Sequence, residues 1–388
     1  MSGGAGVSGG AGVSRGTGSP PTRFRPTVAQ VDLGAIRHNV GVLRPPGVEL
    51  MAVVKANAYG HGAVPVARAA LEGGATWLGV ALVEEGLMLR AAGIEAPILV
   101  LSELPPGAEP EALEALLTPC VYSDAAVTRL SAAGRASGRR VAVHVKVDTG
   151  MHRVGVWPPE DAVPFLARVV ADGLDLEGLW THFARSEDDP VTTKAQVDRF
   201  AGVVEAAAAA GFTPRYLHAS NSGGAISHPE ACFDLVRPGI AIYGIPPAPG
   251  VGEGLGLRPA LTWRSRVTLA KRLPAGERLS YGHRYELAAD SWVATVPAGY
   301  ADGYPRAASS RADVLIGGRR CRVAGNVTMD QVMVDCGDHE IVTGDEVVLV
   351  GRQGDEEISA WELAERADTI AYEIVTRIGD RVPREHTG

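Results

Sequence analysis

Polar side chains follow several short apolar runs in the first two thirds of the chain. The run LMAVV leads to Lys55, and VAVHVKVD carries His144 and Lys146. A lysine amine can act as a nucleophile or a base once its surroundings favour the neutral form. Burying so many polar groups is costly unless they pair with one another or bind a ligand. The pattern therefore indicates a ligand site, with structural ion pairs as the alternative.

Three further apolar runs end in residues suited to binding an anion. LEGLWTHF delivers His182, RYLHASNSGG delivers Asn221 and Ser222, and LVRPGI delivers Arg237 before a glycine. Glycine lets backbone N–H groups approach phosphate oxygens closely. With a lysine on the first run, these loops favour a phosphorylated cofactor held as a Schiff base, and pyridoxal phosphate fits that description. A barrel acting on phosphosugars through a Schiff-base lysine would also fit.

Alternating strands and helices must position these residues. Between about 50 and 240, eight short apolar runs alternate with helical segments, which predicts a (β/α)₈ barrel, with a doubly wound open sheet as the alternative. Alternation places Lys55 with Met51, and Lys146 with His144 and Asp148, on the inner face. The predicted strands are Leu50–Lys55, Trp77–Leu82, Ile98–Leu101, Thr118–Tyr122, Val141–Asp148, Leu176–Phe183, Tyr216–Ser220 and Leu235–Arg237.

The sequence changes character after about residue 250. Strand-like runs such as SWVATVPAG and DEVVLVG are broken by glycine, proline and aspartate, which predicts a mostly β second domain. One late helix is expected near Ser359–Ala367. The resulting division is a disordered Gly/Ser-rich tail at 1–26, the barrel at 27–250 and the β-rich domain at 251–388.

Composition narrows the functional class. The chain has 388 residues and a formal net charge of −8, so it has no overall attraction to nucleic acid or anionic membranes. No apolar run approaches the ~18 residues that a membrane helix needs. The four cysteines form no CxxC pair, so neither a zinc site nor a disulfide scaffold is expected. We expect a cytoplasmic protein without a metal.

The motifs together resemble one family. AVVKANAYGHG is similar to the pyridoxal-phosphate signature of the alanine racemases, which have fold type III. Further segments of the chain resemble other conserved blocks of that family, in the same order. They are KVDTGMHRVGV, GLWTHFA, HASNSGGA, DLVRPGIAIYG, LSYGHRY, PAGYADGYPR, TMDQVMVD and TIAYEIVTRIGDRVPR. The resemblance covers about residues 28 to 385. It implies an isomerase that interconverts L-alanine and D-alanine, supplies D-alanine for peptidoglycan and works as a homodimer with shared active sites.

The resemblance also implies roles for single residues. Lys55 would hold pyridoxal 5'-phosphate covalently and act as the base for D-alanine, and Tyr281 of the partner subunit would act as the base for L-alanine. Arg237 would face the pyridine nitrogen and hydrogen-bond to His182. Because arginine stays protonated, it gives that nitrogen no proton, which we expect to suppress transamination. The phosphate ligands would be Tyr59, Ser222, Gly239, Ile240 and Tyr372, with Asn221 close by.

Substrate binding follows from the same comparison. Arg153 and the backbone at Met329, the latter from the second subunit, would hold the substrate carboxylate. Lys146 matches a lysine that is often carbamylated in the family, and its new carboxylate would orient Arg153; a plain salt bridge to Asp148 is the alternative. Both bases have ordinary pKa values near 10, so their surroundings must lower them. Burial would do so for Lys55, and Arg153 would favour a phenolate at Tyr281.

Three positions depart from the common family pattern. Thr328 stands where cysteine is frequent, Asn326 where an arginine is usual, and Glu187 where an aspartate is common. The last two fall in what the family uses as a substrate corridor, so the corridor's electrostatics are expected to differ.

Other functions remain open from the sequence alone. A broad-specificity racemase shares the architecture, although Tyr281, Tyr300 and Tyr372 should leave room only for a methyl side chain. A decarboxylase would pair the pyridine nitrogen with a carboxylate rather than with Arg237. A non-catalytic pyridoxal-phosphate protein of one barrel would lack the second domain.

Overall fold

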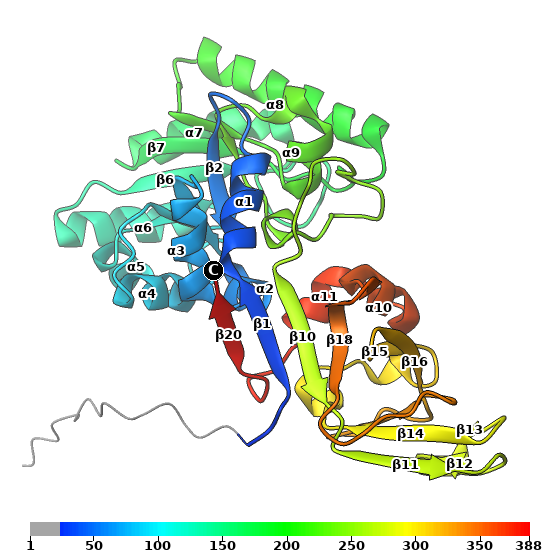
Figure 1. Cartoon of the computed structure of the whole chain (residues 1–388). Coiled ribbons are helices and arrows are strands. Elements are labelled where there is room, and N and C mark those ends of the chain that lie inside the picture. The colour runs from blue at the N-terminus through cyan, green and yellow to red at the C-terminus, as the bar shows by residue number, and fades with distance from the viewer. Residues whose placement is uncertain (1–23) are drawn as a thin grey trace, which may run out of the picture.

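Eight parallel strands form a sheet that curls into a barrel in the computed structural model, which describes residues 24–388 (Figure 1). The first seven strands pair in sequence order, and the eighth pairs with the first. In chain order the strands are β2 (Glu49–Val53), β3 (Trp77–Val80), β4 (Ile98–Val100), β5 (Leu117–Val121), β6 (Ala142–Lys146), β7 (Asp175–Trp180), β8 (Tyr216–His218) and β9 (Leu235–Val236).

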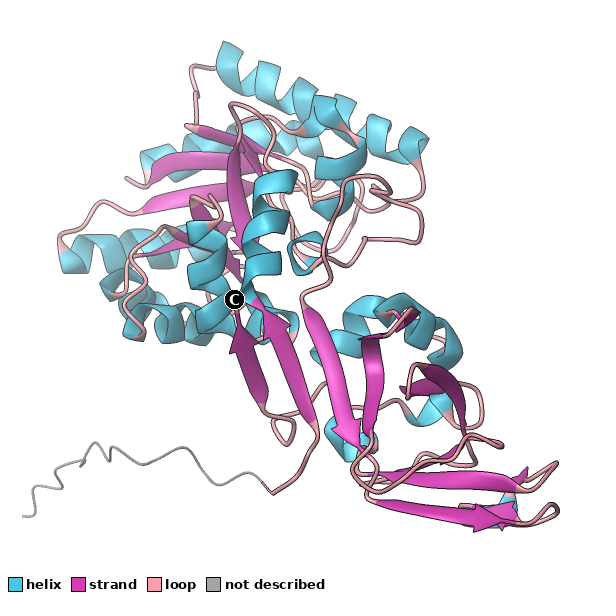
Figure 2. Ribbon diagram, viewed as in Figure 1, coloured by secondary structure: helices cyan, strands magenta, loops and turns pink. Residues whose placement is uncertain are grey.

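Two backbone hydrogen bonds bring β8 beside β9. The Asp234 N–H donates to Leu217 O at 3.0 Å, and the Arg237 N–H donates to Ser220 O at 2.8 Å. The sheet therefore has no open edge of the kind a doubly wound fold requires, and the predicted barrel is confirmed. The helices around it are α1 (Leu33–Leu43), α3 (Ala63–Glu72), α4 (Val83–Ala91), α5 (Glu109–Glu114), α6 (Asp124–Ser137), α7 (Ala162–Ala171) and α8 (Pro190–Ala209) (Figure 2).

The two faces of the barrel strands separate as alternation predicts. Val143 and Val145 of β6 belong to the main apolar core, whereas His144 and Lys146 are buried on the opposite face. The interior also holds Met51, and the His144 ring centroid lies 5.3 Å from that of Trp77. A Cβ on Gly178 would approach His144 Nδ1 to 2.4 Å, so glycine on β7 makes room for the imidazole. The barrel interior is therefore a packed, partly polar core.

All eight predicted barrel strands end sooner than expected at their carboxyl ends. Lys55 lies just past β2, in the short element α2 (Lys55–Tyr59), and His182 lies two residues past β7. The ladder stops because the chain turns away to build the barrel mouth. Polar residues at such ends are where (β/α)₈ barrels place their chemistry.

A second sheet and two helices form the C-terminal domain (Figure 1). The expected late helix is α10 (Ala360–Ala367), which Ser359 caps, and α11 (Ala371–Thr376) follows it. A small hairpin, β12 (Arg278–Leu279) and β13 (Tyr285–Glu286), extends from this domain on the side away from the barrel. The other strands are β10 (Leu261–Arg266), β11 (Leu269–Leu273), β14 (Ser291–Val296), β15 (Asp313–Ile316), β16 (Arg319–Val323), β17 (Val332–Asp335), β18 (Glu346–Gln353), β19 (Glu356–Ile358) and β20 (Arg384–Thr387).

The first strand of the chain joins the C-terminal sheet. β1 (Val28–Asp32) pairs antiparallel with β10 and parallel with β20. This differs from the expectation that residues from 27 onward belong to the barrel, because the pairing partners of β1 lie more than 200 residues away. The expected tail at 1–26 lies mostly outside the described residues, but Arg25 within it forms an ion pair with Asp302.

Two properties of the described residues complete the fold. No helix between residues 24 and 388 is long and apolar enough to cross a membrane. All four cysteines are buried and none forms a disulfide.

Candidate active site at the barrel mouth

Lys55 opens a turn with an unusual backbone. The next four residues, 56–59, all have φ between 51° and 53°, the left-handed region. For residues with a side chain this conformation costs about 1–2 kcal/mol each, so surrounding contacts must hold it. The turn places the Lys55 amine and the Tyr59 phenol at the same end of the barrel.

Contacts from two directions hold this turn. Glu85 accepts the Ala56 N–H at 2.6 Å, and its other oxygen accepts the Ala81 N–H at 2.8 Å. From the C-terminal domain, Arg384 donates to Gly60 O at 2.8 Å, and His386 Nε2 lies 2.8 Å from the carbonyl oxygen of residue 61. The lysine loop is therefore fixed by a barrel helix and by β20 together.

The surroundings of Lys55 favour a neutral amine. Burial lowers its pKa, the positive charge of Arg153 lowers it further, and Glu85 opposes both. This is the direction expected from the sequence. A neutral lysine amine is the form that can attack a carbonyl or accept a proton.

The loops after β8 and β9 form a small cradle. Ser222 Oγ accepts the N–H groups of Gly239 at 2.9 Å and Ala241 at 3.3 Å. A Cβ on Gly239 would approach the Tyr59 hydroxyl to 2.5 Å, so only glycine fits there. The Tyr372 ring centroid lies 6.2 Å from that of Tyr59. The Ser222 and Tyr59 hydroxyls thus lie against the turn at Gly239, and hydroxyl groups beside a glycine backbone can bind a phosphate group.

Burial and hydrogen bonding fix the state of three further residues predicted for this cradle, Tyr59, Asn221 and Ile240. Burial raises the pKa of Tyr59 to about 12, so its hydroxyl keeps its proton and can donate to an anion. Asn221 caps α9 (Ser222–Ser227), because its Oδ1 accepts the Gly224 N–H at 2.9 Å and the Ser186 hydroxyl at 2.7 Å. Ile240, also expected here, is fully buried beside the cradle.

Arg237 lies at the centre of a polar chain inside the barrel. Its Nη2 donates to Thr181 O at 2.7 Å and Ala219 O at 2.9 Å, and lies 3.4 Å from His182 Nδ1. The guanidinium carbon lies 4.6 Å from the ring centroid of Trp180. Burial lowers the pKa of Arg237 to about 9, so it stays positively charged at neutral pH.

Lys146 is buried on the inner face of β6. Burial is the main cause that lowers its pKa to about 8, and its Nζ lies 4.8 Å from the Trp180 ring centroid. The alternative salt bridge to Asp148 does not form among the described residues. One oxygen of Asp148 instead accepts three successive N–H groups, the nearest that of Gly150 at 2.9 Å. A partly neutral buried amine fits a lysine that reacts with carbon dioxide.

Tyr281 is not brought to Lys55 within one chain. It lies between β12 and β13, on the part of the C-terminal domain away from the barrel (Figure 1), and 76% of it is exposed. Met329 is 53% exposed on the same domain. Arg153 is exposed at the barrel mouth, close enough to affect the pKa values of Lys55 and Lys146.

The three departures from the family pattern have local partners. Asn326 donates from its side-chain amide to the Tyr281 carbonyl oxygen at 2.8 Å. Thr328 donates to Gln331 O at 2.7 Å, and a carboxylate oxygen of Glu187 lies 2.9 Å from Ser186 Oγ. Asn326, which replaces the arginine usual in the family, therefore holds the backbone of Tyr281.

Sequence analysis missed four residues that shape this site. His218 contacts Arg237, Trp180 lies under Arg237 and Lys146, and Glu85 and Arg384 hold the lysine loop. Alternation along β8 places His218 inward with Tyr216, so its position could have been inferred. Nothing local to Glu85 or Arg384 indicates their partners, which come from other elements.

Comparison with known proteins gives a consistent result. Residues 31–247 match the family model described as "Alanine racemase, N-terminal domain", and residues 260–386 match "Alanine racemase, C-terminal domain". A curated alanine racemase from Symbiobacterium thermophilum is 53% identical over 372 residues, covering 94% of this chain and 98% of the relative. One from Thermobifida fusca is 46% identical over 369 residues, covering 93% and 98%.

Solved structures agree over nearly the whole chain. Alanine racemase from the D-cycloserine producer Streptomyces lavendulae superposes with a TM-score of 0.89 at 44% identity, covering 95% of this chain and 98% of that one. The Bacillus anthracis alanine racemase, solved with bound L-Ala-P, gives 0.88 at 39% identity and covers 95% and 96%.

Proposed function

The chain belongs to the alanine racemase family, and on that premise we propose that it interconverts L-alanine and D-alanine with two bases, Lys55 and the partner subunit's Tyr281. The observation that carries the proposal is the Lys55 amine, whose pKa burial lowers, on the same turn as Tyr59, which forms the cradle with Ser222 and Gly239. Racemisation removes the α-proton from one face and returns a proton to the other. Two bases on opposite faces suit that task.

Pyridoxal 5'-phosphate is the cofactor that this site fits. When bound, it supplies an electron sink that makes the α-proton of alanine acidic. Tyr59, Ser222, Tyr372 and the backbone at Gly239 and Ile240 would hold its phosphate, with Asn221 keeping α9 in place. Arg237 would face the ring nitrogen. Because a guanidinium keeps its proton, it would leave that nitrogen unprotonated.

Lys55 would hold the cofactor and, when its amine is free, would exchange a proton with the α-carbon of alanine on one face. The partner subunit's Tyr281 would do so on the other side. Its exposed position fits a residue lent across an interface, because a large exposed aromatic often marks a binding surface. A homodimer with two shared sites follows from this arrangement.

Arg153 would bind the substrate carboxylate together with the backbone of the partner's Met329. A carbamate on Lys146 would place a negative charge beside Arg153 and orient it. Tyr300, Tyr372 and the second base would leave space for a methyl side chain, which favours alanine over larger substrates. We also propose, from the family, that the enzyme is cytoplasmic and supplies D-alanine for peptidoglycan.

The direct test is formation of D-alanine from L-alanine by the purified holoenzyme. Lys55→Ala should abolish both the reaction and the visible absorption of covalently bound cofactor. Tyr281→Phe should abolish the reaction but keep that absorption. A racemase of broad specificity would instead turn over serine and larger amino acids at rates comparable to alanine.

The carbamate has a test of its own. Protein equilibrated with ¹³C-labelled bicarbonate should show one carbamate carbon resonance by NMR. Lys146→Met should remove that resonance, whereas Lys271→Met, a change on the C-terminal sheet, should keep it. A wild-type spectrum without the resonance would leave Lys146 as an ordinary amine.

A further inference from the structure

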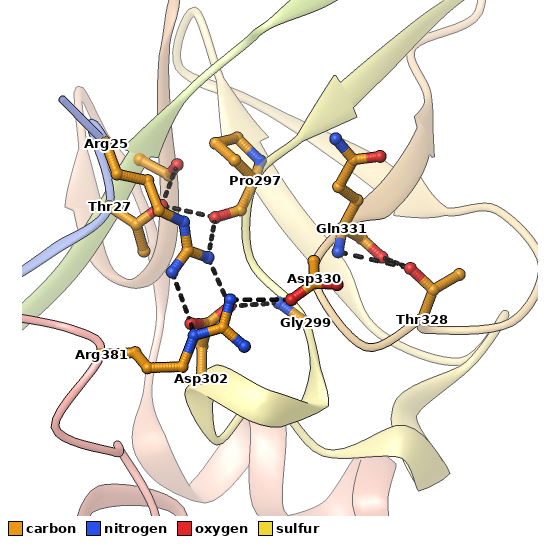
Figure 3. A network of polar contacts seen from close by, with 10 residues as sticks. Arg25, Thr27, Pro297, Gly299, Asp302, Thr328, Asp330, Gln331 and Arg381 are labelled. Atoms are coloured by element: carbon orange, nitrogen blue, oxygen red, sulfur yellow. Dashed lines mark hydrogen bonds and ion pairs between the residues drawn. The ribbon is translucent and has the colours of Figure 1, made fainter.

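Asp302 is a fully buried carboxylate that forms ion pairs with arginines near both ends of the described chain (Figure 3). Arg25 donates to both of its oxygens, with Nη1 at 2.7 Å from Oδ1. Arg381 Nε lies 3.6 Å from Oδ1. Such a group is costly to bury, so the turn that contains it must be held in one arrangement.

The Asp302 carboxylate fixes the turn η5 (Tyr300–Asp302). Its Oδ2 accepts the Gly299 N–H at 2.9 Å, and its backbone oxygen accepts the Gly379 N–H at 3.0 Å. Arg25 also donates to Pro297 O at 2.6 Å, just before the turn. Both sides of the turn that presents Tyr300 are therefore tied to this one cluster.

The same turn holds the segment that carries Met329. The Tyr300 N–H donates to Thr328 O and the Ala301 N–H donates to Met329 O, each at 3.0 Å. A Cβ on Gly299 would approach Met329 O to 2.3 Å, so glycine is what lets the two segments lie this close together. On the far side, Arg381 donates to the Asp330 carboxylate at 2.7 Å. Figure 3 shows the loops of 297–302 and 328–331 linked through these residues.

Tyr300 and Met329 nevertheless lie at the surface of their own chain, 38% and 53% exposed. Residues that one subunit contributes to its partner's active site need a rigid support, because a small displacement of a binding group is enough to weaken catalysis. We propose that Asp302, gripped by Arg25 and Arg381, is a positioning residue that sets Tyr300 and the Met329 backbone for the active site of a second copy of this chain. This inference rests on the shared-site dimer proposed above.

Arg25 is the better arginine to substitute, because it precedes β1 and belongs to no strand. Arg25→Gln should raise the KM for alanine about tenfold, the size expected for losing a charged hydrogen-bonded pair, with kcat nearly unchanged. The cofactor's visible absorption should not change, because Lys55 lies outside the cluster. Arg25→Lys should restore most of the affinity.

Arg352→Gln is the matched control, since Arg352 forms a surface ion pair with Glu357. It should leave KM unchanged. An unchanged KM in Arg25→Gln, or equal falls in kcat and cofactor retention, would show that the cluster only supports the fold and would overturn the proposal.

Mixed dimers decide whether Asp302 acts on its own site or on the partner's. Lys55→Ala protomers mixed with Asp302→Asn protomers should form heterodimers with one intact site, made of an unaltered Lys55 and an unaltered lent surface. The mixture should show two components. About a quarter of wild-type activity should have the wild-type KM, since half of the dimers are mixed and half of their sites are intact, and about another quarter should have the raised KM of the Asp302→Asn homodimers. Activity that shows only the raised KM would place the effect within the chain and overturn the proposal.

The same experiment separates this proposal from the proposed function. Lys55→Ala mixed with Tyr281→Phe should also regain activity; if it does not, the shared-site dimer itself is wrong and the inference falls with it. If Asp302→Asn fails to fold, the double variant Arg25→Gln/Arg381→Gln takes its place in the mixture. Thermal unfolding of each variant checks that the protomers compared are folded.

Discussion

Nη1 of Arg237 lies 2.9 Å from Nδ1 of His218 in the barrel interior. Because a guanidinium only donates, His218 must accept at Nδ1 and carry its proton on Nε2. That Nε2 lies 2.8 Å from His144 Nδ1, and His144 Nε2 in turn lies 3.5 Å from the Glu177 carboxylate. The tautomers of His218 and His144 are therefore both fixed, in a chain of contacts that extends from Arg237 to Glu177 through the barrel interior.

His218 should hold Arg237 in register with the cofactor ring. His218→Leu removes one of the acceptors around Arg237 while the carbonyls of Thr181 and Ala219 remain. We expect cofactor affinity to fall about tenfold, in line with one hydrogen bond to a charged group. Titration of the apoprotein with pyridoxal phosphate, followed by visible absorption, measures this. Leu217→Ala on the other face of β8 should leave the affinity unchanged.

Buried histidines should make the protein less stable in mild acid. Burial lowers the pKa of His61 to about 4 and holds those of His182 and His218 well below their usual range. Below the unfolded-state pKa of about 6.5, the unfolded chain binds more protons than the folded one, so stability falls as pH drops from about 6.5 towards 4.

Denaturant unfolding at a series of pH values measures how the free energy of unfolding changes with pH. We expect a slope of about 1.4 kcal/mol per pH unit for each histidine that stays neutral in the fold. His61→Gln should remove one histidine's share of it. A slope identical to that of the wild-type protein would show that His61 is not neutral in the fold.

Glu85 should act on Lys55 through both structure and charge. Its carboxylate accepts the Ala56 N–H and raises the Lys55 pKa against the effect of burial. Glu85→Gln removes the charge and keeps an acceptor oxygen, so the pKa of Lys55 should fall further. The acid limb of the kcat profile should then move to lower pH, because a base works only when deprotonated. Glu84→Gln, on the exposed side of α4, should leave the limb where it is.

Asn326 should support the second base. Its amide donates to the Tyr281 carbonyl oxygen, so Asn326→Ala should lower kcat/KM about fivefold, the cost of one ordinary hydrogen bond. The loss should be equal for L-alanine and D-alanine, because the equilibrium between them is unaffected by the enzyme. Asn326→Asp has the same size but no donor and should be impaired at least as much. Full activity in that variant would rule out the amide contact as the cause.

Local pattern was enough to predict much of this molecule. The eight strands, the inward faces of β2 and β6 and the helix after Ser359 follow from periodicity and capping, which depend on neighbouring residues. Lys55 and the glycine-rich loops are predicted to form a phosphate-cofactor site for the same reason, and that assignment stays a prediction. The family motifs added roles that spacing by itself leaves open.

Tertiary structure alone decided the long-range relationships. β1 pairs with strands at the other end of the chain, Asp302 is gripped by Arg25 across 277 positions, and Arg384 reaches Gly60 across 324. No local pattern encodes such contacts, because they depend on how barrel closure and sheet pairing bring the chain ends together. The same packing leaves Tyr281 exposed and away from its own barrel, which is why the proposed site draws on a second copy of the chain.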